Sequence, residues 1–412
     1  MTLPIRPVSV DEYDAFARVI EHAFAGPPDP DEVHAVERDL LEFDRTLAAF
    51  DGDEPVATAA AYSFRMTVPG GTALPTAGVT WVGVLPTHRR RGLLTRLMRR
   101  QLDDIRAAGR EPIAALWASE SPIYGRYGYG LASSAMTMAV PHGHHRLHDV
   151  PGTADLRARL VDTGKSVDLV QPVYDRQVMR RPGMLALETD TWRNARIFDP
   201  ESRRDGASPL RTLLVEDTAG RLRGYARYAT KQSWDRSGPA GTAVVHELEA
   251  LDPAAAAAAW RYLLNLDLIT TTRMRNRPTD DPLRYLLVDP RRAQPELGDA
   301  LYVRVVDVVT ALRARTYAVP VESVIEVADP FCPWNAGRWR LTAYEAEVEC
   351  ERTDAPADIS LDVRELGACY LGGTSLHALA DAGLVTEHTP GTVSRLSAAF
   401  RHEPAPWCPF VF

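Results

Sequence analysis

Apolar residues recur at helical spacing in three segments of the first third of the chain. Residues 11–24 show the pattern first, residues 31–41 repeat it with an acidic polar face, and residues 93–108 show it again. Because the period matches that of an α-helix, we predict a helix over each segment. Shorter apolar runs over 46–50, 55–63 and 112–118, and a run that ends at Val84, predict strands. Residues 1–140 therefore read as one α/β unit.

The middle of the chain, residues 141–290, repeats this pattern in a weaker form. The turn and strand of 216–228 echo those of 51–62, and the strand 244–248 precedes an alanine-rich helix that begins at Pro253. Alanine is the best helix former, so that helix is expected. The basic, glycine-containing turn that follows Val84 has no counterpart here. We predict a second unit that keeps the scaffold of the first without its binding loop.

The pattern changes again near residue 291 and defines a third zone, 291–412. Strands are predicted over 302–307, 321–327, 337–344, 345–350 and 357–362, and short helices over 308–317, 366–371, 375–382 and 392–399. The last six residues are mostly apolar, which is unusual for a chain end. The fold class is thus α/β (α+β), with three domains.

Composition narrows the classes of function. A chain of 412 residues exceeds a single core, and the formal net charge of -8 argues against nucleic acid as the main partner. No apolar stretch reaches membrane-span length, so we expect no membrane association. The four cysteines lack metal-like spacing, and the histidines form no paired cluster. We expect free thiols in a reducing cytoplasm and no metal site.

One junction carries the clearest chemical signal. The apolar run Val82, Gly83, Val84 leads into a turn with Arg89, Arg90, Arg91 and Gly92, and Leu93, Leu94 and Thr95 open the next helix. A strand, a glycine turn and a helix start expose backbone N–H groups that bind phosphate, and arginines add charge. Neither the Walker pattern nor GxGxxG is present. The alternative is a basic helix start on a solvated surface.

A second informative stretch follows the strand 112–118. Ser119 and Glu120 lead into three tyrosines, Tyr124, Tyr127 and Tyr129, that alternate with glycines. Glycine permits close backbone approach and turn dihedrals closed to other residues. A phenol with an ordinary pKa near ~10 is a suitable proton donor to a departing thiolate. Tyr124 is our candidate for that role through the family resemblance given below, and Tyr127 and Tyr129 are expected to be packing residues. The alternative is that all three tyrosines only pack.

These stretches, with Leu74–Gly78, Tyr370–Gly373 and the final phenylalanine, resemble the enhanced intracellular survival (Eis) family of GNAT acetyltransferases over essentially the whole chain. The resemblance implies two tandem GNAT units and a sterol-carrier-like domain. It also implies that Val82–Val84 bind the pantetheine of acetyl-coenzyme A, that Arg90–Thr95 hold its pyrophosphate, and that Ser119 and Glu120 line the cleft. Tyr124 matches the general acid. Phe412 matches the residue whose terminal carboxylate is the general base, although an apolar packing plug is the alternative for this tail.

The resemblance implies an acetyl-coenzyme A-dependent N-acetyltransferase that acts on a primary amine, by direct transfer in a ternary complex, and forms a homo-oligomer, a hexamer. The acceptor is a small amine of aminoglycoside-like, lysine- or polyamine-like, or other type. Val411 stands where the aminoglycoside-acetylating relatives tend to carry an acid, and Trp81 replaces their usual phenylalanine. The cleft is therefore less acidic than theirs. A non-catalytic acetyl-coenzyme A sensor and a lipid or sterol carrier remain alternatives.

Overall fold

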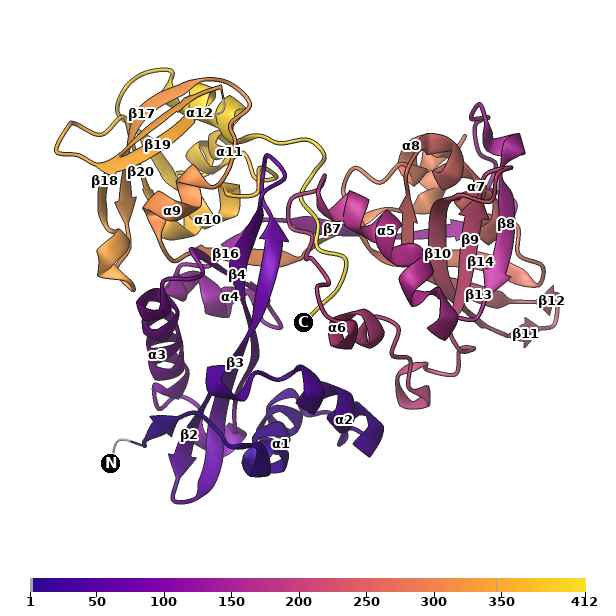
Figure 1. The fold of residues 1–412 in the computed structure, drawn as a ribbon, viewed down its shortest axis with the longest axis horizontal. Helices are drawn as coiled ribbons and strands as arrows, with labels where there is room; N and C mark the ends of the chain where they lie inside the picture. The colour runs from indigo at the N-terminus through magenta and orange to yellow at the C-terminus, as the bar shows by residue number, and fades with distance from the viewer. Residues whose placement is uncertain (1–2, 346) are drawn as a thin grey trace. The chain divides into compact units, whose positions relative to one another are not determined.

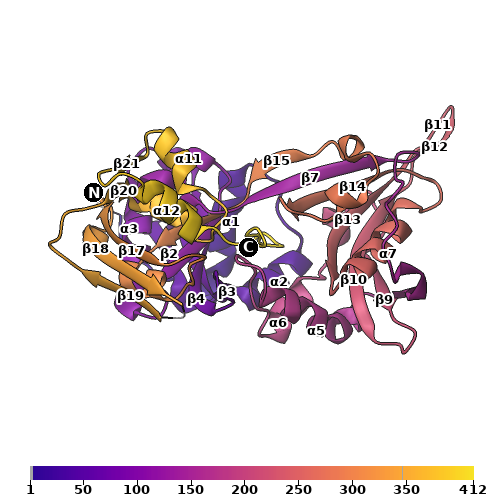
Figure 2. The same cartoon turned by 90° about the horizontal axis from the view of Figure 1, so that it is seen from above.

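The computed structural model describes residues 3–345 and 347–412. Two compact units make up the chain: Met1–Ser133 together with Ala300–Phe412, and Ser134–Asp299. Figures 1 and 2 show both units from two directions. Each contains a seven-stranded sheet, and the first also holds a smaller five-stranded sheet. The predicted α/β class is confirmed, whereas the domain limits at 140 and 290 stay a prediction.

The large sheet of the first unit has the order β1-β2-β3-β4-β5-β16-β6. Its strands are β1 (Ile5–Arg6), β2 (Thr46–Asp51), β3 (Glu54–Thr67), β4 (Ala73–Val84), β5 (Ile113–Trp117), β6 (Gly130–Leu131) and β16 (Leu301–Val305). The last strand comes from far along the chain and pairs antiparallel with both β5 and β6. The segment 302–307, which the sequence placed in the third zone, thus completes the first sheet.

Four helices accompany this sheet: α1 (Tyr13–Phe24), α2 (Asp31–Leu40), α3 (Leu93–Ala108) and α4 (Ser121–Tyr124). The bounds of α3 match the prediction because glycines with left-handed φ values, Gly92 at 75° and Gly109 at 65°, flank its amphipathic run. Its apolar side packs into one core with β2–β5. Helix α1 begins two residues later than predicted, since Val10–Glu12 form a 3₁₀ turn.

The large sheet of the second unit has the order β15-β7-β14-β13-β10-β9-β8. Its strands are β7 (Ser134–Pro141), β8 (Arg157–Val161), β9 (Arg211–Glu216), β10 (Leu222–Lys231), β13 (Gly241–Ala250), β14 (Ile269–Pro278) and β15 (Glu296–Asp299). A hairpin of β11 (Trp234–Asp235) and β12 (Gly238–Pro239) projects from it, and the helices are α5 (Val167–Val178), α6 (Asp190–Ala195), α7 (Pro253–Leu264) and α8 (Leu283–Leu286). Both large sheets contain one parallel pair among antiparallel ones, β4–β5 and β13–β14.

The five-stranded sheet near the C-terminus has the order β19-β18-β17-β20-β21. Its strands are β17 (Val321–Ala328), β18 (Gly337–Tyr344), β19 (Glu347–Arg352), β20 (Ile359–Asp362) and β21 (Val385–Glu387), with helices α9 (Val308–Arg313), α10 (Val363–Cys369), α11 (Leu376–Asp381) and α12 (Thr392–Phe400). Helix α10 lies against β6 and β16. A Cβ at Gly130 would collide with the Arg364 carbonyl, so glycine is required there for this approach.

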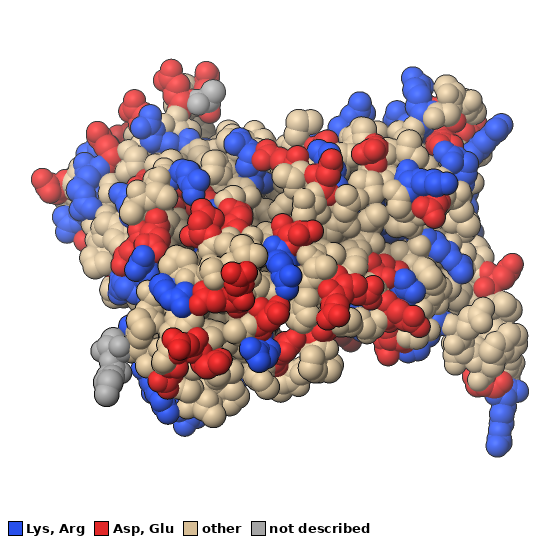
Figure 3. Space-filling view, turned by 60° about the horizontal axis from the view of Figure 1, so that its bottom comes forward, with Lys and Arg blue, Asp and Glu red and all other residues tan. Residues whose placement is uncertain are grey.

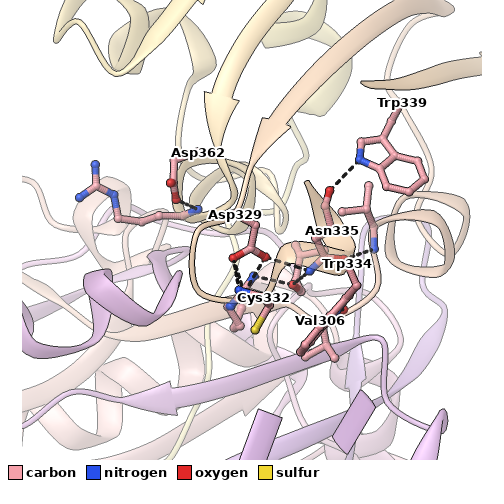
Figure 4. A network of polar contacts seen from close by, with 11 residues as sticks. Val306, Asp329, Cys332, Trp334, Asn335, Trp339 and Asp362 are labelled. Carbon is pink, nitrogen blue, oxygen red and sulfur yellow. Dashed lines mark hydrogen bonds and ion pairs between the residues drawn. The ribbon is translucent and has the colours of Figure 1, made fainter. Parts of the chain in front are cut away.

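A buried polar network fastens β16 to the loop after β17 (Figure 4). Arg304 donates to both Asp329 oxygens at 2.7 and 2.9 Å, and both side chains are fully buried. Asn335 donates to Asp329 at 3.1 Å, and the Trp334 indole donates to the Val306 carbonyl at 2.9 Å. Loss of one partner of such a pair leaves an uncompensated buried charge, so the network ties the small sheet to the large one.

Candidate active site

A β-bulge interrupts β4 near its end. Ala60 pairs with Thr80 and Thr58 pairs with Gly83, so that Trp81 and Val82 both stand opposite Ala59. Trp81 has a φ of 53°, a costly value for a bulky side chain. The centre of its ring lies 6.1 Å from the ring centre of Tyr13 and 5.5 Å from that of Phe16. Its indole N–H donates to the Tyr62 hydroxyl at 3.0 Å. These contacts hold the strained residue, and the bulge re-aims the strand that follows.

The same strand parts from its parallel neighbour. The pairing of β4 with β5 covers only Thr76–Gly78, whereas β5 pairs with β16 along its whole length. The end of β4 beyond Gly78 therefore diverges from β5. Backbone groups along such an edge can pair with an extended ligand that carries amide groups, as a strand would.

A cavity of about 710 Å³ opens at this divergence. Its walls contain Tyr124, a predicted catalytic residue, and almost every predicted cofactor residue: Val82, Gly83, Val84, Arg89, Arg90, Gly92, Leu93, Leu94, Thr95, Ser119 and Glu120. Arg91 is exposed and is not part of the wall. The volume lies within the ~300–1,000 Å³ usual for small-molecule sites. The residues singled out from two separate stretches of sequence thus meet at one cavity.

The basic turn forms the start of α3. Arg90 and Gly92 have left-handed φ values of 61° and 75°, and Gly92 provides no side-chain cap. The N–H groups of the first helical turn lack a side-chain cap and belong to residues that line the cavity, an arrangement able to bind a phosphate. Arg89 acts differently, because it donates to the Ala23 carbonyl at 2.9 Å and to the Val84 carbonyl at 3.4 Å. Its guanidinium braces the turn against α1 and β4.

Tyr124 ends the short helix α4 and is 6% exposed. Burial, followed by the nearby Tyr127 and Glu120, raises the pKa of its phenol to about 12. The hydroxyl is therefore protonated at neutral pH and able to donate. Tyr127 is buried and bonds the Thr95 hydroxyl at 3.2 Å, and the Tyr129 ring lies edge-on 6.0 Å from that of Tyr124.

The chain end reaches the same sheet. The ring of Phe412 lies 4.9 Å from that of Phe64 on β3. A Cβ at Gly78 would collide with the Phe64 ring and stand 3.1 Å from the Phe412 ring, so glycine leaves room for this aromatic pair. Gly78 is also the last β4 residue paired with β5. Phe412 is not part of the wall of the 710 Å³ cavity, but it packs where the two strands begin to part.

Sequence reasoning missed several residues of the wall. Ala23 and Phe24 of α1, His88, Ile123, Arg126 and Tyr127 also line the cavity. Arg126 offered a signal, because it is a basic residue inside the tyrosine- and glycine-rich stretch. The bulge at Trp81 has no signal in the sequence, because the residues of β4 follow the pattern of an ordinary apolar strand.

The corresponding region of the second unit is arranged differently. Strand β13 pairs with β14 only as far as Val245, yet Arg277 donates to the Leu248 carbonyl at 3.2 Å beyond that point. The Asp252 carboxylate caps α7 by accepting from the Ala255 N–H at 2.8 Å. Side chains of the protein itself thus bond the diverging strand and the helix start. Among the described residues, no group of three or more side chains is arranged to hold a metal ion.

Comparisons with known protein families identify three domains in the chain. Two families described as acetyltransferase (GNAT) domain match residues 4–132 and 183–305, and the sterol carrier protein domain family matches 308–409. An uncharacterized N-acetyltransferase of Streptomyces avermitilis is 47% identical over 412 residues, with both chains fully covered.

Two Eis proteins extend the comparison. N-acetyltransferase Eis of Mycobacterium tuberculosis is 35% identical over 374 residues, which cover 88% of each chain. The crystal structure of Eis1 from Mycobacterium abscessus is also 35% identical and superposes with a TM-score of 0.84 over 99% of this chain and 100% of its own. GNAT acetyltransferases use acetyl-coenzyme A as co-substrate. The chain therefore belongs to the Eis family and is an acetyltransferase with two GNAT domains and a C-terminal sterol-carrier-protein domain.

Proposed function

We propose that this enzyme transfers the acetyl group of acetyl-coenzyme A to a primary amine, by direct transfer within a ternary complex. The observation that carries the proposal is the 710 Å³ cavity, whose wall joins the free edge of β4, the uncapped start of α3 and the protonated Tyr124. The corresponding region of the second unit has its helix start capped by Asp252. We therefore assign the activity to the first unit.

The residues divide into binding and chemical groups. The backbone of Val82–Val84 pairs with the pantetheine amides, and Arg90 with the N–H groups of Gly92–Thr95 holds the pyrophosphate. Arg89 fixes the turn, Arg91 adds positive charge beside it, and Ser119 and Glu120 line the same cavity. An extended amide chain and a diphosphate match these groups in order along the cavity.

Acetyl-coenzyme A supplies the activated acetyl thioester, and the chain moves the two protons. The acceptor nitrogen forms the new bond to the carbonyl carbon while the carbon–sulfur bond breaks. The Tyr124 hydroxyl gives its proton to the leaving thiolate. The terminal carboxylate of Phe412 takes the proton of the amine, directly or through a water, and also attracts the cationic amine. An α-carboxylate is a weak base in water, with an ordinary pKa near ~3.5, so attraction of the cationic amine and a relaying water support this role.

The acceptor class remains open among aminoglycoside-like, lysine- or polyamine-like and other small amines. Val411, beside the terminal residue, is 67% exposed and carries no charge. Trp81 adds an aromatic surface next to Tyr62 and Tyr13. The absence of charge at Val411 favours amines of low total charge over polycations.

The proposal extends to assembly and compartment. We infer a homo-oligomer, a hexamer as the family resemblance implies. Large apolar side chains of the second unit, such as Tyr285 at 71% exposure and Leu297 at 70%, are available for contacts between subunits. All four cysteines are buried free thiols, which suits the cytoplasm. The described residues contain no helix able to span a bilayer. Acidic and basic side chains are interspersed on the face drawn in Figure 3, an arrangement that does not suit nucleic acid.

Thiol release from acetyl-coenzyme A, measured with a panel of amines, tests the function. We expect release that depends on the amine and a matched acetylated product by mass spectrometry. Coenzyme binding without release for any amine would favour a sensor. Binding of neither coenzyme nor amine, with uptake of lipid instead, would favour a carrier.

A further inference from the structure

A second cavity, of about 210 Å³, lies beside the loop that follows Tyr124. Its walls come from three segments of the first unit: Gly125, Arg126 and Gly128, then 329–331, then 362–364. The volume is below the ~300–1,000 Å³ of sites for drug-sized ligands. At ~30 Å³ for each water molecule it equals about seven waters, which is room for a small metabolite.

Two of the charged groups around this cavity are already neutralised. Asp329 lies in the wall, but Arg304 bonds both of its oxygens and the Cys332 N–H donates to it at 2.8 Å (Figure 4). Arg364 donates to the buried Glu365 at 2.7 Å. The Arg304–Asp329 pair and the Arg364–Glu365 pair each have no net charge, so neither pair attracts a charged ligand strongly.

The remaining wall charges are Arg126 and Asp362. Arg126 is exposed, donates only to the Ile123 carbonyl at 2.9 Å, and lies 5.6 Å from the Tyr127 ring centre. Asp362 accepts from the Arg364 N–H at 2.9 Å. Within the described part of the chain, neither side chain forms an ion pair. The cavity thus presents one cation and one helix-capping carboxylate that are outside any ion pair of the described residues, and Pro330, Phe331 and Val363 add apolar wall.

We propose that this cavity binds a small zwitterion of the α-amino-acid class. Arg126 receives the ligand carboxylate, since a guanidinium pairs with it in bidentate geometry. Asp362 receives the ammonium group, and the apolar wall contacts a short side chain. The complementary arrangement of charges favours the zwitterion over simple anions and simple amines, which would leave one wall charge unmatched.

Arg126 connects the second cavity to the candidate active site, because it lines both cavities. This residue lines the 710 Å³ cavity as well and follows Tyr124 by two positions. A ligand that holds its guanidinium changes the charge available to the coenzyme cleft. Because coupling between two bound ligands is reciprocal, coenzyme A must alter the affinity for the zwitterion by the same factor.

Calorimetry on the full chain without coenzyme tests the proposal, with L-alanine as the probe at constant ionic strength. Propionate and ethylamine, which each keep one of its two charges, are the comparison ligands. We expect L-alanine to bind at least about tenfold more tightly than either. Equal affinity for L-alanine and ethylamine, or no binding of L-alanine, would overturn the proposal.

The variant Asp362→Asn separates this site from the acceptor site, where an amino acid could also bind. Asparagine caps a helix as well as aspartate, so α10 keeps its start. We expect at least tenfold weaker L-alanine binding and unchanged propionate binding, whereas Asp354→Asn, an exposed acid outside the cavity, leaves both unchanged. If L-alanine bound the Asp362→Asn variant as tightly as the wild type, the calorimetric signal would come from another site and the proposal would be wrong. The readout needs no acetyl transfer, so the proposal stands or fails independently of the proposed reaction.

Discussion

The ring of Phe412 meets the ring of Phe64 at 4.9 Å between centres and an angle of 66°. This edge-to-face contact seats the chain end on β3, next to the glycine at which β4 and β5 begin to part. Aromatic pairs of this geometry contribute about 0.5–1.5 kcal/mol beyond area burial. The contact fixes the last residue, and with it the position of its carboxylate.

Changing the chain end should therefore remove activity. Deleting Phe412 moves the carboxylate back by about one residue, ~3.3 Å in an extended chain, and errors of even ~1 Å are costly in a catalytic group. Appending a few residues converts the carboxylate into a peptide. Both changes should nearly abolish acetyl transfer in a thiol-release assay.

Coenzyme affinity in these end variants should stay within severalfold, and an N-terminal tag should have little effect. Full activity of a C-terminally extended enzyme would mean that another group accepts the proton of the amine. The tail would then be a packing element only.

Arg90→Glu should weaken acetyl-coenzyme A binding by at least tenfold, or about 1.4 kcal/mol. The change places a negative charge beside the N–H groups at the start of α3, where the pyrophosphate is expected. Calorimetry measures the effect. Arg110→Glu makes the same charge reversal at an exposed position just after α3 and outside the cavity, so it should bind normally. Equal losses in both variants would indicate a general charge effect instead of a contact.

Tyr124→Phe should lower turnover by about 10²-fold, a typical loss for one general acid, and leave coenzyme affinity unchanged. Because the pKa of this phenol is raised to about 12, the wild-type rate should not fall through loss of the Tyr124 proton until the pH approaches that value. Tyr129→Phe is the matched control. Its hydroxyl is buried without a hydrogen-bond partner in the described structure, so its removal should leave turnover intact.

Glu249→Gln should stabilise the protein at alkaline pH. Burial raises the pKa of this carboxyl to about 7, above the ~4.3 of the unfolded chain. The protonated form thus favours folding below pH ~4.3, and this contribution is lost as the pH rises through about 7. Glutamine removes that loss, so urea unfolding should show a larger gain in stability at pH 8 than at pH 5.

Glu247→Gln should have the opposite effect. Arg227 and the Tyr225 hydroxyl bond this carboxylate at 2.7 and 2.6 Å, and these partners with Arg196 hold its pKa at about 2 despite burial. Neutralising it leaves buried guanidinium charge uncompensated, at a cost of about 3–5 kcal/mol at neutral pH. If both glutamine variants changed stability in the same direction, the assigned charge states would be wrong.

The elements with local signals could be predicted from the sequence, and those set by distant contacts could not. Helix α3 was predictable because its period and its flanking glycines are local. Helix α10 begins at Val363, ahead of the predicted 366–371, because Asp362 caps it. Helix α9 ends at Arg313, short of the predicted residue 317. The sequence pattern identified a strand at 302–307 but not its neighbours, because partner choice depends on tertiary contacts.

The features of the candidate site also divide into those that local motifs predict and those that tertiary contacts determine. Contiguous motifs predicted the turn at Arg89–Gly92 and the wall at Ser119, Glu120 and Tyr124, which meet at one cavity. The strained φ of Trp81 depends on the packing of α1 and on Tyr62, which no motif encodes. Likewise, no local pattern in the sequence indicates that Glu247 and Glu249 are buried, yet they are 4% and 7% exposed.

Strand β16 makes the acetyltransferase unit impossible to excise as one continuous piece. Residues 301–305 form β16, which pairs with β5 on one side and with β6 on the other. A fragment that stops near residue 140 would lack β16, so the backbone groups of β5 and β6 that bond to it would be unpaired. During synthesis, the large sheet of the first unit has no complete set of strands until the ribosome has passed residue 305. Domain grafting or gene splitting must therefore move that strand together with the first 133 residues, or rebuild it from another source.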